Sequence, residues 1–596
     1  MRRRTLTTAV FFLAGAVLFT GCASGVGTAG TAPGLYELSS FGGGRIVTTR
    51  YGRVRAMPID KDVLFWRAIP YAEPPVDALR WKAPRDPKPW TGVMYKKTDQ
   101  PRAVQFGLIK RSVSGDEDCL YLNVWRPDTP EKDLPVVVWI HGGGNTTGSF
   151  MTLPDYSGQM PAHRQNVVFV GINYRLGPFG WFLQDALAEE SGSTDLDRSG
   201  NFGLLDIMKA LEWVKSNISA FGGDPGNVTV SGESAGGINI LALLMSPLSG
   251  GLFDKAQIRS GGIMVSDPEE GFARGNEVLR TLLAEDGLSG EEADAWIAAK
   301  SPEETAAYLR SQPAKRIVRL FEPKHFGMIT MPILFTDGTV LPEEGKEVFS
   351  TGEYPSKVPV MIGSNADEVR LFMAFSKRYS EYDDFYLAGT EYGSNIWKAN
   401  GVDSIARALT GNPDQPPVYA YHFRWGTLHG TGSEVWSVLP KDRGARFGSC
   451  HALEIPFFAG TVEDPSILFS AVFFNRANEP GRIRLQNAIL SYTKEFLRTG
   501  NPGTGSGSGG GGSETFPGAE ALPEWTPWTN GAGNRCMVLD AGYRDLRLGM
   551  IPLEMTDEKA RAILRSKTSA GEYEEVLNIM DEDGPSLEIL DKVYDE

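Results

Sequence analysis

Cysteine is scarce in this sequence of 596 residues, which has only four, at positions 22, 119, 450 and 536. The four lie far apart and form no C-x-x-C pair, and the chain also has no H-E-x-x-H motif. A disulfide framework, a structural zinc site and a zinc protease site therefore have no support in the sequence. We expect no metal site.

Basic residues are also fewer than acidic ones, with 59 Lys and Arg against 74 Asp and Glu, so the formal net charge at pH 7 is -15. An acidic surface argues against binding to nucleic acid and against electrostatic docking on anionic lipid. The contents of 41% hydrophobic and 22% charged residues are those of an ordinary globular protein. We find no internal repeats.

No apolar run is long enough to span a bilayer. Three arginines precede the apolar residues 9–20, a run shorter than the roughly 20 residues that a membrane helix needs. This arrangement is typical of a signal peptide. Residues 1–21 are therefore predicted to direct export and then to be removed.

The end of this segment resembles a bacterial lipobox, in which a cysteine is acylated after cleavage. It reads Leu-Phe-Thr-Gly-Cys up to Cys22, although Phe19 stands where leucine is usual. We expect a membrane-anchored lipoprotein of the periplasm or cell surface, with Cys22 as the lipidation site and residues 22–44 as a flexible tether. The alternative is ordinary cleavage near Cys22 and a periplasmic or secreted protein without the anchor.

The most informative stretch is Val228 to Gly237. A short β-branched run predicts a strand, and Gly-Glu-Ser-Ala-Gly around Ser234 then fits the G-x-S-x-G nucleophile elbow, in which a strand turns sharply into a helix. A Cβ at either motif glycine would collide with the neighbouring strand or helix. The apolar run after Gly237 predicts the buried helix that the motif requires. Ser234 is therefore the candidate nucleophile.

Apolar runs without polar alternation recur along the chain and are separated by segments of helical period. Such strands predict a mostly parallel sheet covered by helices on both faces. Ligands of such sheets bind beyond the carboxyl ends of the strands, where the Ser234 turn and the glycines after His141 fall. The fold class is α/β.

We expect one main domain over residues 45–545. The polar, helix-rich region at 267–336 reads as a cap-like insertion, and the Gly/Ser-rich residues 503–513 as a surface loop. Residues 546–596 are acidic and partly helical, and we expect them to form an extension without a core of its own.

A serine nucleophile needs a base, and the base needs a third group to orient it. In the order serine, acid, histidine, the histidines at 141 and 163 come too early, His325 lies in the expected cap and His422 inside an expected strand. His429 and His451 remain as candidate bases. The acid should follow a strand after the elbow, where Asp367 and Glu368 are equally suitable on chemistry alone.

Six ordered motifs resemble those of the type B carboxylesterase and cholinesterase family, over nearly all of Arg45 to Asp540. They are Glu-Asp-Cys-Leu-Tyr-Leu-Asn-Val at 117–124, Trp-Ile-His-Gly-Gly-Gly at 139–144, Asn-Tyr-Arg-Leu-Gly at 173–177, Phe-Gly-Gly-Asp-Pro at 221–225 with the elbow, Asp-Glu at 367–368, and His-Ala-Leu-Glu-Ile-Pro-Phe at 451–457. The resemblance implies an α/β-hydrolase fold and a serine hydrolase that cleaves small carboxylic esters through an acyl-enzyme, without metal or organic cofactor.

The resemblance also implies the site. It assigns Ser234, His451 and Glu368 as the catalytic triad, and the backbone N–H groups of Gly143, Gly144 and Ala235 as the oxyanion hole. Glu233 and Ser260 match supporting residues, the first a buried carboxylate beside the nucleophile and the second a serine that contacts the triad acid.

One departure from the family concerns Cys119, which sits where the family has half of a disulfide. The expected upstream partner is missing, so we expect a free, buried Cys119. The same chemistry on an amide, carbamate or lactone is an alternative function. A non-catalytic adhesion role, also known in this family, is disfavoured because the serine, acid and histidine are all present. The sequence does not indicate the oligomeric state.

Overall fold

The computed structural model describes residues 34–98, 101–107, 112–150, 157–374, 383–427, 446–464, 473–505 and 522–583. The predictions for residues 1–21, Cys22, most of the tether and His429 lie outside these ranges, as do residues 506–513 of the Gly/Ser-rich loop. Within the described ranges, no helix combines the length and the apolar character needed to cross a bilayer.

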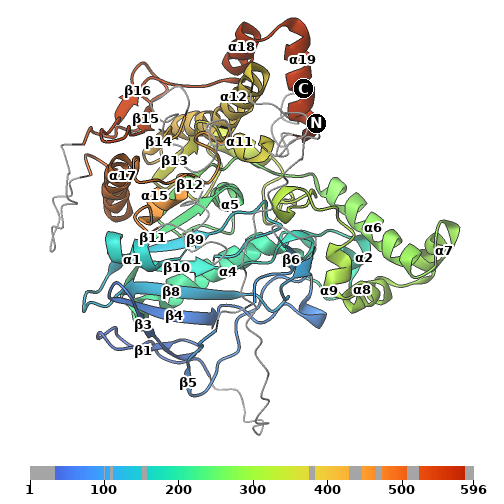
Figure 1. Ribbon diagram of the computed structural model, residues 1–596. Helices are drawn as coiled ribbons and strands as arrows, with labels where there is room; N and C mark the ends of the chain where they lie inside the picture. Colours follow the sequence, from blue (N-terminus) through green and yellow to red (C-terminus); the bar gives the residue numbers. More distant parts are fainter. Residues whose placement is uncertain are drawn as a thin grey trace, which may run out of the picture.

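An 11-stranded sheet forms the centre of the molecule (Figure 1), in the order β16-β15-β14-β13-β12-β11-β9-β10-β8-β4-β3. Its strands are β3 (Met57–Ile59), β4 (Val63–Pro70), β8 (Tyr121–Pro127), β9 (Leu134–Ile140), β10 (Val168–Ile172), β11 (Gly223–Glu233), β12 (Lys255–Arg259), β13 (Val360–Asn365), β14 (Val418–Phe423), β15 (Cys536–Leu539) and β16 (Gly549–Ile551). Two small sheets join β1 (Ile46–Thr49), β2 (Gly52–Arg55) and β5 (Val93–Met94), and β6 (Gln105–Phe106) with β7 (Val113–Ser114).

The middle of the central sheet is parallel, from β10 through β9, β11, β12, β13 and β14 to β15. Antiparallel strands complete both edges. All seven residues of β9 are buried, as the continuous apolar run predicts for a strand covered on both sides. The predicted α/β-hydrolase architecture, a mostly parallel sheet with helices around it, is therefore confirmed.

Helices cover the two faces of this sheet with different cores. Alternate residues of β9 belong to opposite cores, because successive side chains of a strand point to opposite faces. Val136 and Val138 pack in the large cluster with α4 (Phe202–Asn217) and α5 (Ala235–Met245). On the other face, Val137 and Trp139 lie in the cluster that includes residues of α1 (Gln159–Gln165) and α17 (Glu479–Thr499).

The region at 267–336 contains a group of helices with a hydrophobic cluster that it shares with neighbouring segments. Figure 1 shows this group projecting from one side of the sheet, in light green. The helices are α6 (Pro268–Glu285), α7 (Glu291–Ala299), α8 (Pro302–Ser311) and α9 (Ala314–Val318). The other short α-helices within the described residues are α2 (Asp185–Glu189), α3 (Asp195–Arg198), α10 (Val348–Thr351), α11 (Arg370–Met373), α13 (Ser404–Thr410) and α15 (Ile455–Ala459).

The C-terminal extension differs from the expectation. β16 pairs with β15, so the sheet continues past residue 545. Beyond it, α18 (Asp557–Lys567) and α19 (Ala570–Asp583) pack beside α12 (Asp384–Lys398) and share a buried cluster with it (Figure 1). The described part of the extension therefore packs against the main domain through this shared cluster. Apolar residues at helical spacing, such as Val576, Ile579 and Met580, form one buried face within an otherwise acidic sequence.

Candidate active site

Ser234 stands between β11 and α5 in a strained backbone conformation, with φ 57° and ψ -127°. Positive φ is costly for a residue with a side chain and persists only where the surroundings impose it. Here the Ser234 N–H donates to the carbonyl oxygen of Arg259 on β12, at 2.9 Å. The arrangement is that of a nucleophile elbow.

The two motif glycines allow the close contacts that this turn requires. A Cβ on Gly232 would lie 2.6 Å from the Gly236 backbone, and a Cβ on Gly236 would lie 2.0 Å from the Ile140 carbonyl oxygen. Both distances are far shorter than any real carbon contact. The strand and the helix can therefore meet at Ser234 only because neither position has a side chain.

His451 and Glu368, distant in sequence, are in direct contact. The Nδ1 atom of His451 lies 2.7 Å from Oε2 of Glu368, whose Oε1 accepts the Asn365 N–H at 2.7 Å. The neighbouring Asp367 is occupied elsewhere, because its carboxylate pairs with Arg370 and accepts the Ser449 N–H. Of the two candidate acids, only Glu368 therefore orients this imidazole.

The fold explains why these two residues meet. Glu368 lies in the turn after β13, and His451 lies in the turn before α15. Because β13 pairs in parallel with β14, their carboxyl ends open at the same edge of the sheet. The His451 N–H also approaches the Glu368 carbonyl oxygen at 3.3 Å, so the two turns are joined through their backbones too.

The other ring nitrogen of His451 faces Glu233, which immediately precedes Ser234. Nε2 lies 3.0 Å from Oε1 of Glu233, and both side chains are buried. Burial raises the pKa of Glu233 to about 8, against the opposing effect of His451. Burial alone would lower the pKa of His451, but the nearby carboxylates, Glu233 first, raise it to about 9. The charges of the imidazole and the carboxylate are therefore coupled, because each raises or lowers the pKa of the other.

A third buried carboxylate, Glu454, belongs to the same group. Its Oε2 accepts from Nδ2 of Asn365 at 2.5 Å, and burial, reinforced by Glu368, raises its pKa to about 7. The positive charge of Arg259 acts in the opposite direction and lowers the pKa of Glu233. The site is therefore a cluster of three buried carboxylates around one imidazole, with an arginine as counter-charge.

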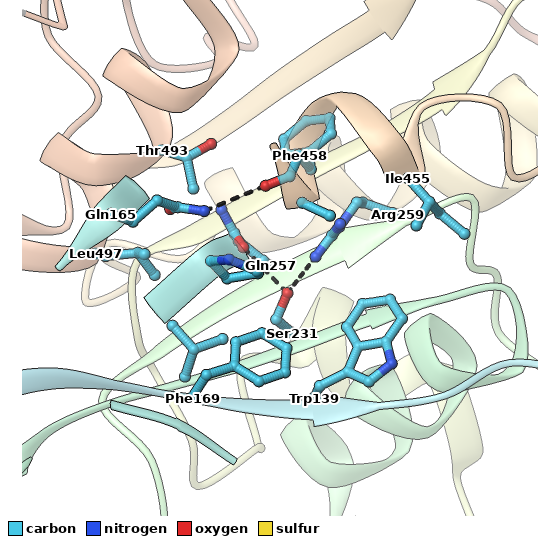
Figure 2. Close-up of a pocket in the computed structure, with 13 residues that line it drawn as sticks. Trp139, Gln165, Phe169, Ser231, Gln257, Arg259, Ile455, Phe458, Thr493 and Leu497 are labelled. Atoms are coloured by element: carbon cyan, nitrogen blue, oxygen red, sulfur yellow. Dashed lines mark hydrogen bonds between the residues drawn. The ribbon is translucent and has the colours of Figure 1, made fainter. Parts of the chain in front are cut away.

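Arg259 lies beside a small cavity between the sheet and helices α1, α15 and α17 (Figure 2), with a volume of about 30 Å³. Its guanidinium carbon lies 5.0 Å from the ring centre of Trp139 and 4.9 Å from that of Phe458. The guanidinium also donates to the Ser231 hydroxyl. Two aromatic faces stabilise this buried cation in place of water.

The glycines after His141 form the other wall of the site. Gly143 and Gly144 have φ values of 115° and 61°. Within the described part of the chain, their N–H groups donate to no protein acceptor, while the Gly143 carbonyl accepts from the N–H groups of Thr146 and Thr147. Two backbone donors are thus left free, and Ala235 begins α5 directly after Ser234. A tetrahedral oxyanion needs donors of this kind.

The remaining histidines that the structure describes occupy other positions in the fold. His141 stacks on Tyr174, with ring centres 4.5 Å apart, and burial lowers its pKa to about 4. His422 lies inside β14, as expected, and His325 lies in a short 3-10 turn at the end of the cap region. His163 is on α1, on the opposite face of the sheet from α5.

Ser260 and Cys119 complete the residues singled out from the sequence. Ser260 follows β12 with φ 47°, and its buried hydroxyl makes no hydrogen bond to a residue that the structure describes, Glu368 included. Cys119 is a free thiol and fully buried, as predicted. Sequence reasoning missed Glu454 and Arg259. The one signal in the sequence was their position, because Glu454 lies three residues after His451 and Arg259 immediately precedes Ser260.

The arrangement suits attack by an alcohol on a carbonyl carbon. It holds a serine at a strained turn, an imidazole that a buried carboxylate orients, and free backbone donors for a developing oxyanion. Within the described residues, no group of three or more histidine, cysteine, aspartate or glutamate side chains is arranged to hold a metal ion.

Comparison with known proteins agrees with this chemistry. Residues 43–391 match the family model described as "Carboxylesterase family". The chain is 32% identical over 487 residues to the para-nitrobenzyl esterase of Bacillus subtilis, an alignment that covers 77% of this chain and 91% of that protein. It is 28% identical over 509 residues to carboxylesterase 1D of Rattus norvegicus, covering 77% of this chain and 86% of the relative.

Solved structures give the same result. A para-nitrobenzyl esterase structure superposes with a TM-score of 0.65 at 29% identity, over 87% of this chain and 99% of that one. A carboxylesterase of Geobacillus stearothermophilus superposes with a TM-score of 0.65 at 27% identity, over 87% of this chain and all of that one.

Proposed function

The chain belongs to the carboxylesterase family and is a carboxylic ester hydrolase, and we propose that Ser234, His451 and Glu368 carry out its reaction as a catalytic triad. The observation that carries this proposal is the 2.7 Å contact between His451 Nδ1 and Glu368 Oε2 beside the Ser234 elbow. The substrate is a small molecule with a carboxylic ester bond.

In this mechanism, the Ser234 hydroxyl attacks the ester carbonyl while Nε2 of His451 takes its proton. Glu368 holds the imidazole by its Nδ1–H and stabilises the positive charge that forms. The protonated His451 then donates to the leaving alcohol as the acyl-enzyme forms. A water molecule, deprotonated by the same nitrogen, releases the acid and regenerates Ser234.

The negative charge of the tetrahedral intermediate falls on the former carbonyl oxygen. The backbone N–H groups of Gly143, Gly144 and Ala235 are the donors that would receive it. Loss of one such donor typically lowers turnover about 100- to 1,000-fold. Support comes from the free N–H groups of the two glycines in the described structure.

Glu233 and Ser260 act around this triad rather than in it. Glu233 lies against Nε2 of His451 and raises the pKa of the imidazole, which favours the protonated form that donates to the leaving alcohol. Ser260 forms part of the backbone at the end of β12, where its N–H donates to the Gly363 carbonyl oxygen at 2.8 Å. We assign Ser260 a structural role.

The export signal is a separate proposal, supported by the composition of residues 1–22. We propose that residues 1–21 are removed and that Cys22 carries a lipid that holds the enzyme at a membrane. Labelled palmitate should enter the wild-type protein and not the Cys22→Ala variant. Incorporation that persists in Cys22→Ala would exclude the lipid anchor.

Fluorophosphonate labelling tests the triad. The reagent should label the wild-type protein but not Ser234→Ala. It should also label the control variant Ser219→Ala, in which an exposed serine elsewhere is replaced. Hydrolysis of p-nitrophenyl acetate should fall by roughly 10⁶-fold in Ser234→Ala, the effect of removing a triad nucleophile. Equal labelling of Ser234→Ala and wild type would overturn the assignment.

A further inference from the structure

Trp397, which the mechanism above does not use, packs against the catalytic imidazole. Its ring centre lies 5.0 Å from that of His451, and Phe372 stacks on it with ring centres 6.4 Å apart. Phe372 also lies 5.4 Å from the His451 ring. The Trp397 side chain is only partly buried. Two aromatic rings thus bound the space around His451.

Trp397 is also held against the end of strand β12. Its Nε1–H donates to the carbonyl oxygen of Gly261 at 3.2 Å. The chain then passes so close to Gly261 that a Cβ on Gly401 would lie 2.5 Å from the same oxygen. The approach occurs in η7 (Ala399–Asp403), a single π-helical turn that continues α12. Such turns are rare and change the direction in which side chains leave a helix.

The next residue, Lys398, is directed into the protein interior. Its Nζ pairs with Oδ1 of Asp403 at 2.5 Å, and each side chain is 1% exposed. The second oxygen of Asp403 accepts the N–H of Met555 at 2.6 Å. Asp403 therefore joins the π-helical turn to the start of the C-terminal extension through two buried contacts.

The C-terminal helices α18 and α19 pack against α12, the helix that carries Trp397. Val576, Ile579 and Met580 of α19 are buried in one cluster with residues of α12, and Trp397 packs against that cluster. A Cβ on Gly393 would lie 3.1 Å from Met580 on one side and 3.1 Å from Val369, the neighbour of Glu368, on the other. Helix α12 is thus enclosed between α19 and the turn that carries the acid.

We propose that Trp397 determines which esters fit beside His451, and that α18 and α19 hold it in place through α12 and the Lys398–Asp403 pair. This inference rests on the ester hydrolase mechanism proposed above. A large ring held by these contacts limits the bulk of the ester group that can lie against the imidazole. If α12 loses its outer support, the ring gains freedom and that limit relaxes.

The first experiment measures the selectivity of Trp397 variants. kcat and KM are determined for p-nitrophenyl esters of graded acyl length and for acetate esters of graded alcohol size. For each series, the selectivity ratio is kcat/KM for the bulkiest ester divided by kcat/KM for the smallest. Trp397→Ala should raise this ratio by about 10-fold or more in at least one series, an effect of the size that one methylene has on selectivity in an apolar pocket. Trp397→Phe, which retains a ring, should recover most of the wild-type ratio.

The second experiment loosens the C-terminal helices. Val576→Asp places a charge in their buried interface, and Glu575→Ala changes an exposed neighbour on the same helix as the matched control. Limited proteolysis should cut Val576→Asp near Lys567 while fluorophosphonate labelling shows that the main domain is intact. Met580→Ala is a milder change of the same interface, in case Val576→Asp does not fold.

Val576→Asp and Met580→Ala should change the ratio of kcat/KM values in the same direction as Trp397→Ala. Combining either variant with Trp397→Ala should change the ratio little further, because both changes act through the Trp397 side chain. A ratio that stays within about twofold in both series for Trp397→Ala would overturn the role of the tryptophan. An unchanged ratio in a variant with freed C-terminal helices would overturn the coupling. A wild-type protein that cleaves no ester would instead contradict the proposed mechanism itself.

Discussion

The Nε2 atom of His451 lies 3.0 Å from Oε1 of Glu233, the residue joined to Ser234 by a peptide bond. The imidazole of this proposed base is therefore bounded by carboxylates at both nitrogens, since Glu368 occupies Nδ1. Such an environment favours the imidazolium form. This environment should assist protonation of the leaving alcohol. It should also mean that His451 becomes a neutral base only at a higher pH.

This arrangement predicts an alkaline rise of activity. Only neutral His451 can accept the Ser234 proton, and its pKa is raised to about 9. The value of kcat/KM should therefore increase with pH along a limb whose midpoint lies well above the ordinary imidazole pKa near 6.5. A pH–rate profile with p-nitrobenzyl acetate measures it, with the enzyme's stability checked at each pH. A midpoint at or below 6.5 would contradict the prediction.

Removing the carboxylate beside Nε2 should move this limb to lower pH. In Glu233→Gln, the loss of the negative charge destabilises the imidazolium, so the pKa of His451 falls and neutral base is available in more acidic solution. Glu353→Gln, at an exposed position distant in sequence, is the matched control and should leave the profile unchanged. An unshifted limb in Glu233→Gln would mean that this contact does not control the base.

Adding a methyl group at Gly236 should disrupt the turn that holds Ser234. A Cβ in Gly236→Ala would lie 2.0 Å from the Ile140 carbonyl oxygen, so α5 must move away from β9 and carry Ser234 with it. We expect fluorophosphonate labelling to fall by at least about 100-fold and unfolding free energy to drop by about 1–3 kcal/mol, as for other overpacked sites. Gly571→Ala, where a Cβ meets nothing within 4 Å, should retain both properties.

The buried ion pair between Arg175 and Asp206 should contribute strongly to stability. Nη2 and Nε of Arg175 lie 2.7 and 2.8 Å from the two Asp206 oxygens, and both residues are fully buried. Asp206→Ala would leave the guanidinium buried and unpaired, at a cost of about 3–5 kcal/mol. Glu212→Ala, which breaks the surface pair with Lys209, should cost at most about 1 kcal/mol. Urea denaturation of the two variants decides whether the costs differ.

The three described cysteines should behave as free and protected thiols. Cys119, Cys450 and Cys536 are buried, and burial raises the pKa of each thiol. In a Cys22→Ala background, a thiol reagent should find no reactive group in the native protein and three after denaturation without reductant. A smaller number after denaturation would mean that two of them form a disulfide.

Much of the architecture could be predicted because its causes are local. The apolar runs at β9 and β10 predict covered strands, and the G-x-S-x-G spacing around Ser234 predicts a sharp strand-to-helix turn, whatever the rest of the chain does. The choice between Asp367 and Glu368 could not be made from these patterns, and it came from a family resemblance. In the structure, Asp367 is engaged by Arg370 and Ser449, which leaves Glu368 for the imidazole.

The sequence by itself determined the parallel α/β sheet and the elbow at Ser234, because strand burial and glycine clearance are properties of short segments. Only the tertiary structure decided that Glu454 and Arg259 lie within the electrostatic field of His451. It also decided that Trp397, beside His451, packs against the buried cluster that α12 shares with α18 and α19. Those relationships depend on burial and on distances between segments far apart in the sequence, which no local pattern of side chains encodes.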